Sequence, residues 1–153
     1  TRMFGYLLSW LQDKQSSVYI IATANNAESL PPELKRKGRF DEIFCVNLPN
    51  REERKAIFQV HLKKRKKNLN ENMDSLLNAT EGFNGADIES VVNEALEDCF
   101  INQQPLSIAK LTEVAKETVS ISKSCGKQIE SMKKLFDENC FKDASTGKYT
   151  KRF

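Results

Sequence analysis

Three side chains in the first third of the chain could recognise a phosphate group. Asn25 directly follows the apolar run 18–24, and Arg36 and Arg39 flank Gly38. An amide at the carboxyl end of a buried strand lies where α/β sheets bind ligands, and it can orient water without adding charge. A planar guanidinium can neutralise phosphate oxygens. Taken singly, Asn25 is better explained as a strand-end cap, and the arginines as a solvated basic loop.

A second group of candidate residues lies further along the chain. Residues 80–88 read Thr-Glu-Gly-Phe-Asn-Gly-Ala-Asp-Ile, so that Gly85 and Ala86 follow Asn84, a residue placed to cap a helix. Small residues at a helix start let a ligand lie against the backbone, which larger side chains would block. His61 is the single histidine of the chain. A histidine on an apolar helix face is either a satisfied core residue or a ligand contact.

The elements that must position the first group belong to a short α/β part. Apolar residues at three- and four-residue steps predict a helix over residues 3–11. The β-branched run 18–23 predicts a strand buried on both faces of a parallel sheet, and residues 43–46 predict a second strand. The two prolines at 31–32 suit the first turn of a short helix.

From residue 50 onward the sequence predicts helices alone. Asn50 and Glu53 form a capping-box pattern before a helix that carries His61 on its apolar face. The clearest apolar periodicity follows Asn84, which predicts the central helix of the helical part. Further helices are expected at residues 74–79, at 111–118 and around 129–136.

Composition and charge limit the class of protein. The 153 residues, 39% hydrophobic and 29% charged, form one ordinary domain or two small ones and lie far from the disordered range. A net charge of +3 is too small to indicate a nucleic-acid or membrane partner. We expect no signal peptide. No apolar run approaches the roughly 20 residues of a membrane span, and no cysteines are spaced closely enough to form a zinc pair. We expect a cytoplasmic protein with reduced thiols and no metal site of its own.

Residues 21–41 closely resemble the second region of homology of AAA-family ATPases. In that family a strand ends in a polar residue called sensor 1, and an R-x-G-R-F-D turn supplies arginine fingers. Asn25 matches sensor 1, and Arg36 and Arg39 match the fingers. The resemblance implies that these are the catalytic residues, with Asn25 positioning water and the arginines reaching the nucleotide of a neighbouring subunit. Such fingers contribute about 10³ to 10⁵ in rate, so that catalysis would require a ring.

The resemblance continues into the helical part. Residues 80–88 are similar to the T-x-G-F-S-G-A-D-L box of the family's lid domain, which implies that the backbone of Gly85 and Ala86 packs against adenine and ribose. His61 matches a family histidine near the same groups. The implied fold is α/β, the C-terminal piece of a P-loop NTPase parallel-sheet domain followed by an all-helical AAA lid. The expected domains are the α/β part (1–50), the lid (51–141) and a polar tail (142–153).

Two motifs that this family needs are absent from the sequence. No segment reads G-x-x-x-x-G-K-[ST], the loop that holds phosphates, and no apolar strand ends in Asp-Glu, the Walker B pattern that supplies carboxylates for magnesium. We therefore expect the C-terminal part of a longer ATPase, in which ATP and Mg²⁺ also need residues outside this chain. The chain alone should hydrolyse no ATP. Residues 1–50, without the rest of their sheet, should have unpaired strand edges and be distorted, domain-swapped or stabilised by crystal contacts.

The resemblance implies a ring-forming ATPase, hexameric in the parent protein, that remodels a protein substrate. The residues around Asn25 and Lys37, which replaces a usual proline, look most like soluble bacterial AAA proteins of unassigned role. The junction at residues 48–51 would be the hinge of the lid. Two alternatives remain: a non-catalytic oligomerisation or adaptor module, and a nucleic-acid-binding module that uses the basic cluster 63–67. This cluster is otherwise a solvated helix end whose charges complement the helix dipole.

Overall fold

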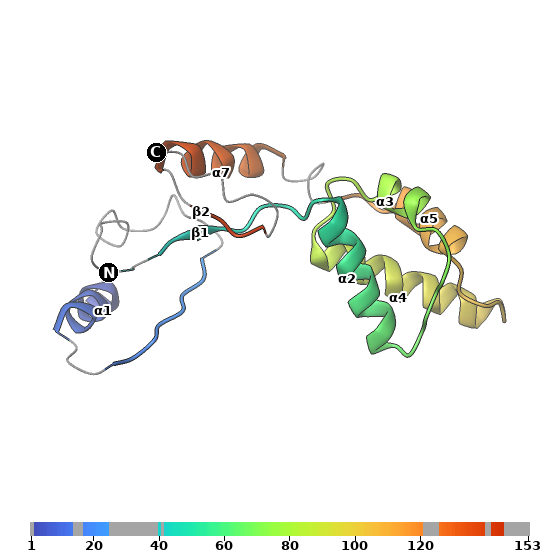
Figure 1. Ribbon diagram of the computed structural model, residues 1–153, viewed down its shortest axis with the longest axis horizontal. Helices are drawn as coiled ribbons and strands as arrows, with labels where there is room; N and C mark the ends of the chain where they lie inside the picture. Colours follow the sequence, from blue (N-terminus) through green and yellow to red (C-terminus); the bar gives the residue numbers. More distant parts are fainter. Residues whose placement is uncertain are drawn as a thin grey trace. The chain divides into compact units, whose positions relative to one another are not determined.

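The computed structural model describes residues 2–13, 17–24, 40, 42–120, 126–139 and 142–145 (Figure 1). The chain divides into two compact units. The helical unit is Asn47–Ile129, and the mixed unit combines Thr1–Val46 with Glu130–Phe153.

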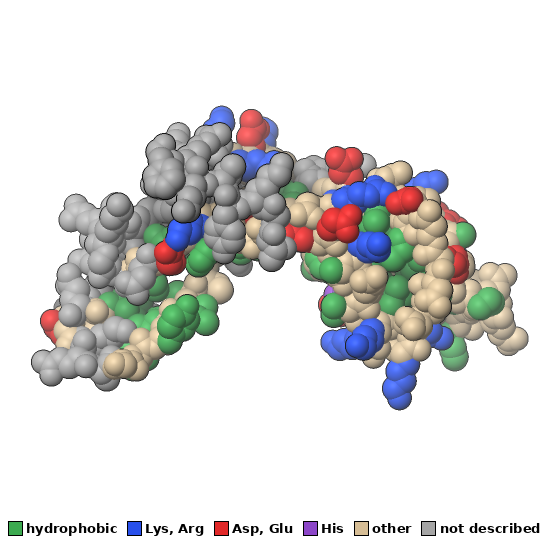
Figure 2. Space-filling model, viewed as in Figure 1, with side chains coloured by type: hydrophobic (Ala, Val, Ile, Leu, Met, Phe, Trp, Pro, Cys, Tyr) green, Lys and Arg blue, Asp and Glu red, His purple; other side chains and the backbone are tan. Residues whose placement is uncertain are grey.

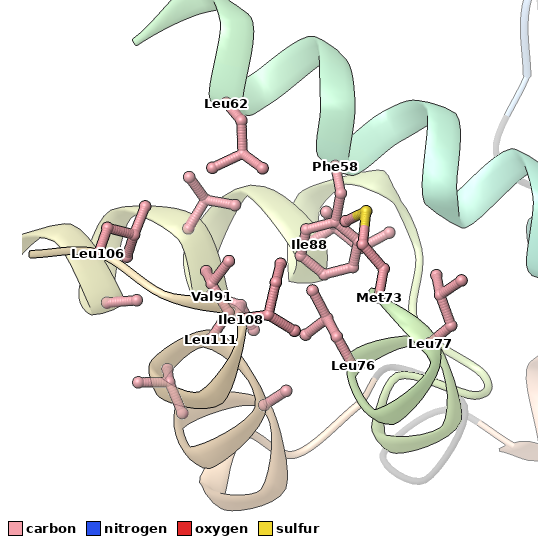
Figure 3. Close-up of a cluster of buried hydrophobic side chains, with 14 of the residues drawn as sticks. Phe58, Leu62, Met73, Leu76, Leu77, Ile88, Val91, Leu106, Ile108 and Leu111 are labelled. Atoms are coloured by element: carbon pink, nitrogen blue, oxygen red, sulfur yellow. The ribbon is translucent and has the colours of Figure 1, made fainter. Parts of the chain in front are cut away.

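The helical unit contains four of the described helices, packed around one apolar core. They are α2 (Arg51–Lys64), α3 (Asp74–Ala79), α4 (Gly85–Ile101) and α5 (Ile108–Glu117). α2 packs against α4 and α3, and α5 packs against α3 and α4. Phe58, Leu76 and Ile88 meet where α2, α3 and α4 come together, and all three side chains are fully buried (Figure 3). Charged side chains of both signs cover the face of this unit seen in Figure 2. The helices predicted after residue 50 are confirmed.

Side-chain caps explain where these helices begin. Asn50 Oδ1 accepts the Glu53 N–H at 3.0 Å, and the Glu53 carboxylate accepts the Asn50 N–H at 2.8 Å. Asn84 and Asp87 form the same reciprocal pair at the start of α4, at 2.8 Å and 3.1 Å. Each cap satisfies two backbone donors that have no partner inside the helix, and such a cap contributes about 0.5–2 kcal/mol. Both capping interactions were expected from the sequence.

Two helices end in turns that place an ordinary residue in the left-handed region. Lys66 after α2 has φ of 55°, and Gln103 after α4 has φ of 53°. The turns are closed by the hydrogen-bond pair of the Schellman motif, from Lys66 N to Lys63 O (2.9 Å), Lys67 N to Leu62 O (2.9 Å), Gln103 N to Phe100 O (3.3 Å) and Gln104 N to Cys99 O (2.9 Å). Glycine is the usual residue at this position because a Cβ is strained there.

The mixed unit contains α1 (Arg2–Asp13) and a two-stranded parallel sheet. β1 (Phe44–Cys45) pairs with β2 (Lys142–Asp143) in a register that aligns the first residue of each strand. Lys142 Nζ also lies 2.5 Å from Glu42 Oε2. The predicted first helix and second strand are therefore confirmed. The strand at 142–143, within the segment expected to be a polar tail, was not predicted.

The predicted strand at residues 18–23 is wrong. Residues 17–24 have no regular secondary structure, and the side chains of Tyr19 and Ile21 are 90% and 80% exposed. A central strand needs a neighbour on each side to take up its backbone hydrogen bonds. Among the described residues, the sheet consists of β1 and β2 alone, and neither pairs with this run. The apolar run is therefore not part of the sheet among the described residues.

The last predicted helix is present as α7 (Gly126–Asn139). The short helix predicted from residues 31–32 lies outside the described residues. In the described part of the chain, no helix has the length and apolar character needed to cross a bilayer.

Candidate functional site

The predicted site residues fall in two parts of the chain. Three of them, Asn25, Arg36 and Arg39, lie outside the described residues, and their roles stay predictions. His61, Gly85 and Ala86 all belong to the helical unit, in α2 and at the start of α4.

His61 faces α4. Its side chain is 17% exposed, and its Nδ1 atom lies 3.5 Å from Glu89 Oε1 on α4. The same Nδ1 atom lies 3.3 Å from a terminal nitrogen of Arg65, one turn further along α2. Two charged groups therefore occupy one side of the imidazole ring. The other ring nitrogen, Nε2, has no hydrogen bond to a residue in the described ranges.

Arg65 connects α2 to α4. Its guanidinium donates to the His61 carbonyl at 3.1 Å, to Glu89 Oε1 at 3.2 Å, and from Nε to Asn93 Oδ1 at 3.0 Å. A planar group with several fixed donors suits such a set of acceptors. The sequence treated residues 63–67 as a solvated helix end. For Arg65 that interpretation is wrong, because its side chain is 21% exposed and paired across two helices.

Glu89 is the anionic member of this group. The hydrogen bond from Arg65 lowers the pKa of Glu89, and the charges of His61, Arg65 and Lys64 act in the same direction, while partial desolvation opposes them. The side chain is therefore a carboxylate at neutral pH. It gives His61 and Arg65 a common partner on α4.

Gly85 and Ala86 form the open start of α4. A Cβ built on Gly85 would have no other atom within 4 Å, and Ala86 is exposed. Glu89 follows Gly85 by four residues, so both lie on the same face of the helix. Because His61 contacts Glu89, the structure brings the histidine to the face of α4 that carries Gly85. Gly85 and Ala86 thus form the first turn of α4, and His61 contacts the next turn through Glu89.

This arrangement suits a flat, polar ligand better than a metal ion. The bare backbone at Gly85 offers close van der Waals approach, and His61 Nε2 offers one hydrogen bond. Within the described ranges, no group of three or more His, Cys, Asp and Glu side chains gathers to hold a metal. The predicted absence of a metal site in this chain stays a prediction.

Sequence reasoning missed two arginines at the start of the helical unit. Arg51 binds α3 through Asp74 Oδ1 at 2.6 Å and Asn78 Oδ1 at 2.5 Å. Arg54, 7% exposed, donates to the carbonyls of Pro49 at 3.0 Å and Leu77 at 3.1 Å. Desolvation lowers the pKa of Arg54. A positive charge in the first turn of a helix interacts unfavourably with the helix dipole. This unfavourable position was the feature of the sequence that could have indicated that the arginines bind partners on another element.

Comparison with known families gives a match in each of two segments of the chain. Residues 1–48 match the family model described as "ATPase family associated with various cellular activities (AAA)", and residues 70–105 match the one described as "AAA+ lid domain". The chain belongs to the AAA family. The order of the two matches, with helices and a small parallel sheet, confirms the predicted fold class of an AAA α/β piece followed by a helical lid.

Similar AAA proteins include several of unassigned role. The chain is 41% identical over 133 residues to the uncharacterized AAA domain-containing protein ycf46 of Guillardia theta, covering 86% of this chain and 26% of that protein. It is 36% identical over 148 residues to ycf46 of Pyropia yezoensis, covering 94% and 30%. The proteasome-activating nucleotidase of Sulfurisphaera tokodaii is 48% identical over 79 residues, covering 52% and 20%. The chain thus spans less than a third of the length of these relatives. No solved structure matches it.

Proposed function

We propose that this chain supplies the sensor, finger and lid parts of a AAA enzyme that binds and hydrolyses ATP as a hexameric ring and remodels a protein substrate. Membership of the family supports the ATPase activity, and one relative is by name a proteasome-activating nucleotidase. The observation that carries the proposal is that His61 contacts Glu89, which follows the open backbone at Gly85 by one turn of α4.

Each site residue has a distinct role in this proposal. Asn25 orients the attacking water, because an amide positions it without taking its proton. Arg36 and Arg39 extend to the nucleotide of the neighbouring subunit and neutralise charge on the transferred phosphoryl group. Gly85 and Ala86 line the adenine and ribose with backbone, and His61 contacts them from α2.

In this proposal the helical unit binds the adenosine part of ATP and not its phosphates. The open backbone at Gly85 supports contact with a planar base, whereas Mg²⁺ needs oxygen ligands, and no metal-binding cluster is found among the described residues. When bound, ATP supplies the phosphoryl group and Mg²⁺ neutralises its charge. The residues that hold both belong to the phosphate loop and Walker B motif, which the sequence of this chain lacks.

The hinge between the α/β part and the lid lies at the junction, residues 48–51, in this proposal. Arg51 holds the start of α2 to α3, and Arg54 binds the Pro49 carbonyl as well as that of Leu77. These contacts make residues 49–54 part of the lid. A rotation of the lid would therefore be absorbed at the N-terminal edge of the junction, before Pro49.

Arg39→Ala tests the proposed finger, in a longer protein in which this chain follows a phosphate-binding loop. We expect kcat to fall by about 10³ to 10⁵ while the Kd for ATP stays nearly unchanged, because the finger acts on the transition state of the neighbouring site. Lys37→Ala, which removes a positive charge from the same segment, is the control and should leave kcat close to the wild-type value. Unchanged turnover in Arg39→Ala would reject the assignment.

A further inference from the structure

We propose that the lid carries a second binding site, a groove at the C-terminal end of α2 that takes an acidic peptide segment through one aliphatic side chain. The groove shares no residue with the group around His61, Gly85 and Glu89. The proposal therefore goes beyond the ATPase function and does not depend on it.

The groove has an apolar floor and a polar, basic rim. It encloses about 200 Å³. Its floor is formed by Leu62, Leu69 and Met73, and its rim by two lysines, Lys63 and Lys67, and three amides, Gln59, Asn68 and Asn70. Leu62 and Met73 also belong to the core of the helical unit, so the floor is anchored in the fold.

The turn after α2 builds this groove. Lys66 adopts the left-handed conformation, and the Lys67 N–H returns to the Leu62 carbonyl at 2.9 Å. The chain therefore reverses within one turn of the helix end. As a result Lys67 and the loop that follows it line the same groove as Lys63. The two basic side chains converge because of the local backbone, which a sequence pattern of consecutive lysines does not reveal.

The charge of the rim is not neutralised within the helical unit. Lys63, Lys64, Lys66 and Lys67 form no ion pair with any residue in the described ranges. Lys110, by contrast, is paired with two carboxylates. Glu71, in the loop beside the groove, accepts the Ile108 N–H at 3.2 Å. Figure 2 shows basic side chains gathered at the end of the helical unit where α2 meets this loop in Figure 1. An anionic partner would complement this rim.

The volume and the lining residues of the groove favour a peptide over other anionic partners. Sites for small molecules usually enclose about 300–1,000 Å³, so this groove suits a single side chain better than a whole ligand. An inorganic anion has no apolar surface that could be buried against the floor of the groove. Single-stranded nucleic acid is bound by stacking on aromatic side chains or arginine, and no such side chain lines the groove. Met73 can adapt to different aliphatic anchors because its side chain is unbranched and flexible.

Fluorescence anisotropy of this chain with three labelled probes tests the proposal. The probes are a ten-residue peptide of aspartate and glutamate with one central leucine, the same peptide with serine in place of leucine, and a ten-nucleotide oligouridylate. We expect the leucine peptide to bind about 10-fold or more tightly than the serine peptide, because an aliphatic side chain is buried. The oligouridylate should bind more weakly than the leucine peptide.

Two matched double variants locate the site. Lys63→Glu with Lys67→Glu should weaken the leucine peptide about 10-fold or more, since attraction at two rim positions becomes repulsion. Lys55→Glu with Lys116→Glu changes the net charge equally at exposed positions outside the groove and should weaken it much less. The leucine-to-serine comparison uses the unmodified chain, so it stands even if a variant fails to fold. Equal binding of both peptides, tighter binding of the oligouridylate, equal effects of the two double variants, or no binding of any peptide would each overturn the proposal.

Discussion

Replacing Lys66 with glycine should stabilise the helical unit, and replacing Lys64 with glycine should destabilise it. Lys66 is the left-handed residue that ends the turn after α2, whereas Lys64 is the last residue of the helix itself. The same substitution therefore falls on a left-handed backbone at residue 66 and on a right-handed helical backbone at residue 64. Both variants lose one exposed lysine near the helix C-terminus, so the loss of charge largely cancels in the comparison.

The magnitudes follow from the backbone. A residue with a Cβ in the left-handed conformation is strained by about 1–2 kcal/mol, and glycine removes this strain. Glycine also has more conformational entropy in the unfolded chain, which stabilises the unfolded state by about 0.4–1 kcal/mol and offsets part of the relief of strain. The net stabilisation for Lys66→Gly is therefore about 0.5–1 kcal/mol. Lys64→Gly should cost about 0.5–1 kcal/mol, because glycine is a poor helix former.

Thermal unfolding followed by far-ultraviolet circular dichroism measures both changes. In a unit of this size 1 kcal/mol corresponds to a Tm shift of about 4–8 °C, so the two variants should differ by roughly that amount or more, in opposite directions from wild type. Urea unfolding gives the free energies directly. If Lys66→Gly lowers Tm as much as Lys64→Gly does, residue 66 is not left-handed, and the turn that builds the proposed peptide groove is different.

Three further predictions concern the same unit and the chain as a whole. Phe58→Ala should lower the free energy of unfolding by about 3–5 kcal/mol, measured in urea, because Phe58 is fully buried between α2, α3 and α4. The hydrogen bond from Arg51 lowers the pKa of Asp74. The stabilisation of the folded state by this carboxylate is therefore present above the unfolded pKa of about 3.9 and is lost as pH falls through the lower folded pKa. Asp74→Asn should make the free energy of unfolding depend less on pH in the acid range. The purified chain should release no phosphate from ATP in a turnover assay, since it has no phosphate loop, and steady release would contradict this expectation.

Local patterns predicted the helical unit well because its determinants are local. Asn50 with Glu53 acts across three residues and was expected, as was Asn84 as a cap, and the structure adds the reciprocal bond of Asn84 with Asp87. Apolar periodicity likewise specified the helices around Phe58, because a helix buries one face whatever its partner is.

Features that depend on distant partners were missed or misjudged. The run 18–23 has strand composition, but a strand also needs neighbours, and among the described residues it pairs with neither strand of the sheet. Lys142 and Asp143 have no strand composition, yet they pair with β1. Arg65 and Glu89 are 24 residues apart, so no helical spacing indicated their contact. The resemblance to AAA proteins predicted His61 and Gly85 as site residues, and the structure shows Glu89 and Arg65 in contact with the histidine.

The central claim is that ATP lies against the open start of α4, and ATP affinity of a Gly85→Leu variant tests it most directly. A Cβ at Gly85 would meet no atom of the other elements within 4 Å, so the fold should tolerate leucine while the proposed ligand surface is blocked. Gly126→Leu is the matched control, because Gly126 is an equally open glycine at the start of α7. Measured by calorimetry in a longer protein that carries the phosphate loop, Gly85→Leu should weaken ATP binding about 10-fold or more, and Gly126→Leu should leave it unchanged. Equal ATP affinity in both variants and wild type would contradict the claim.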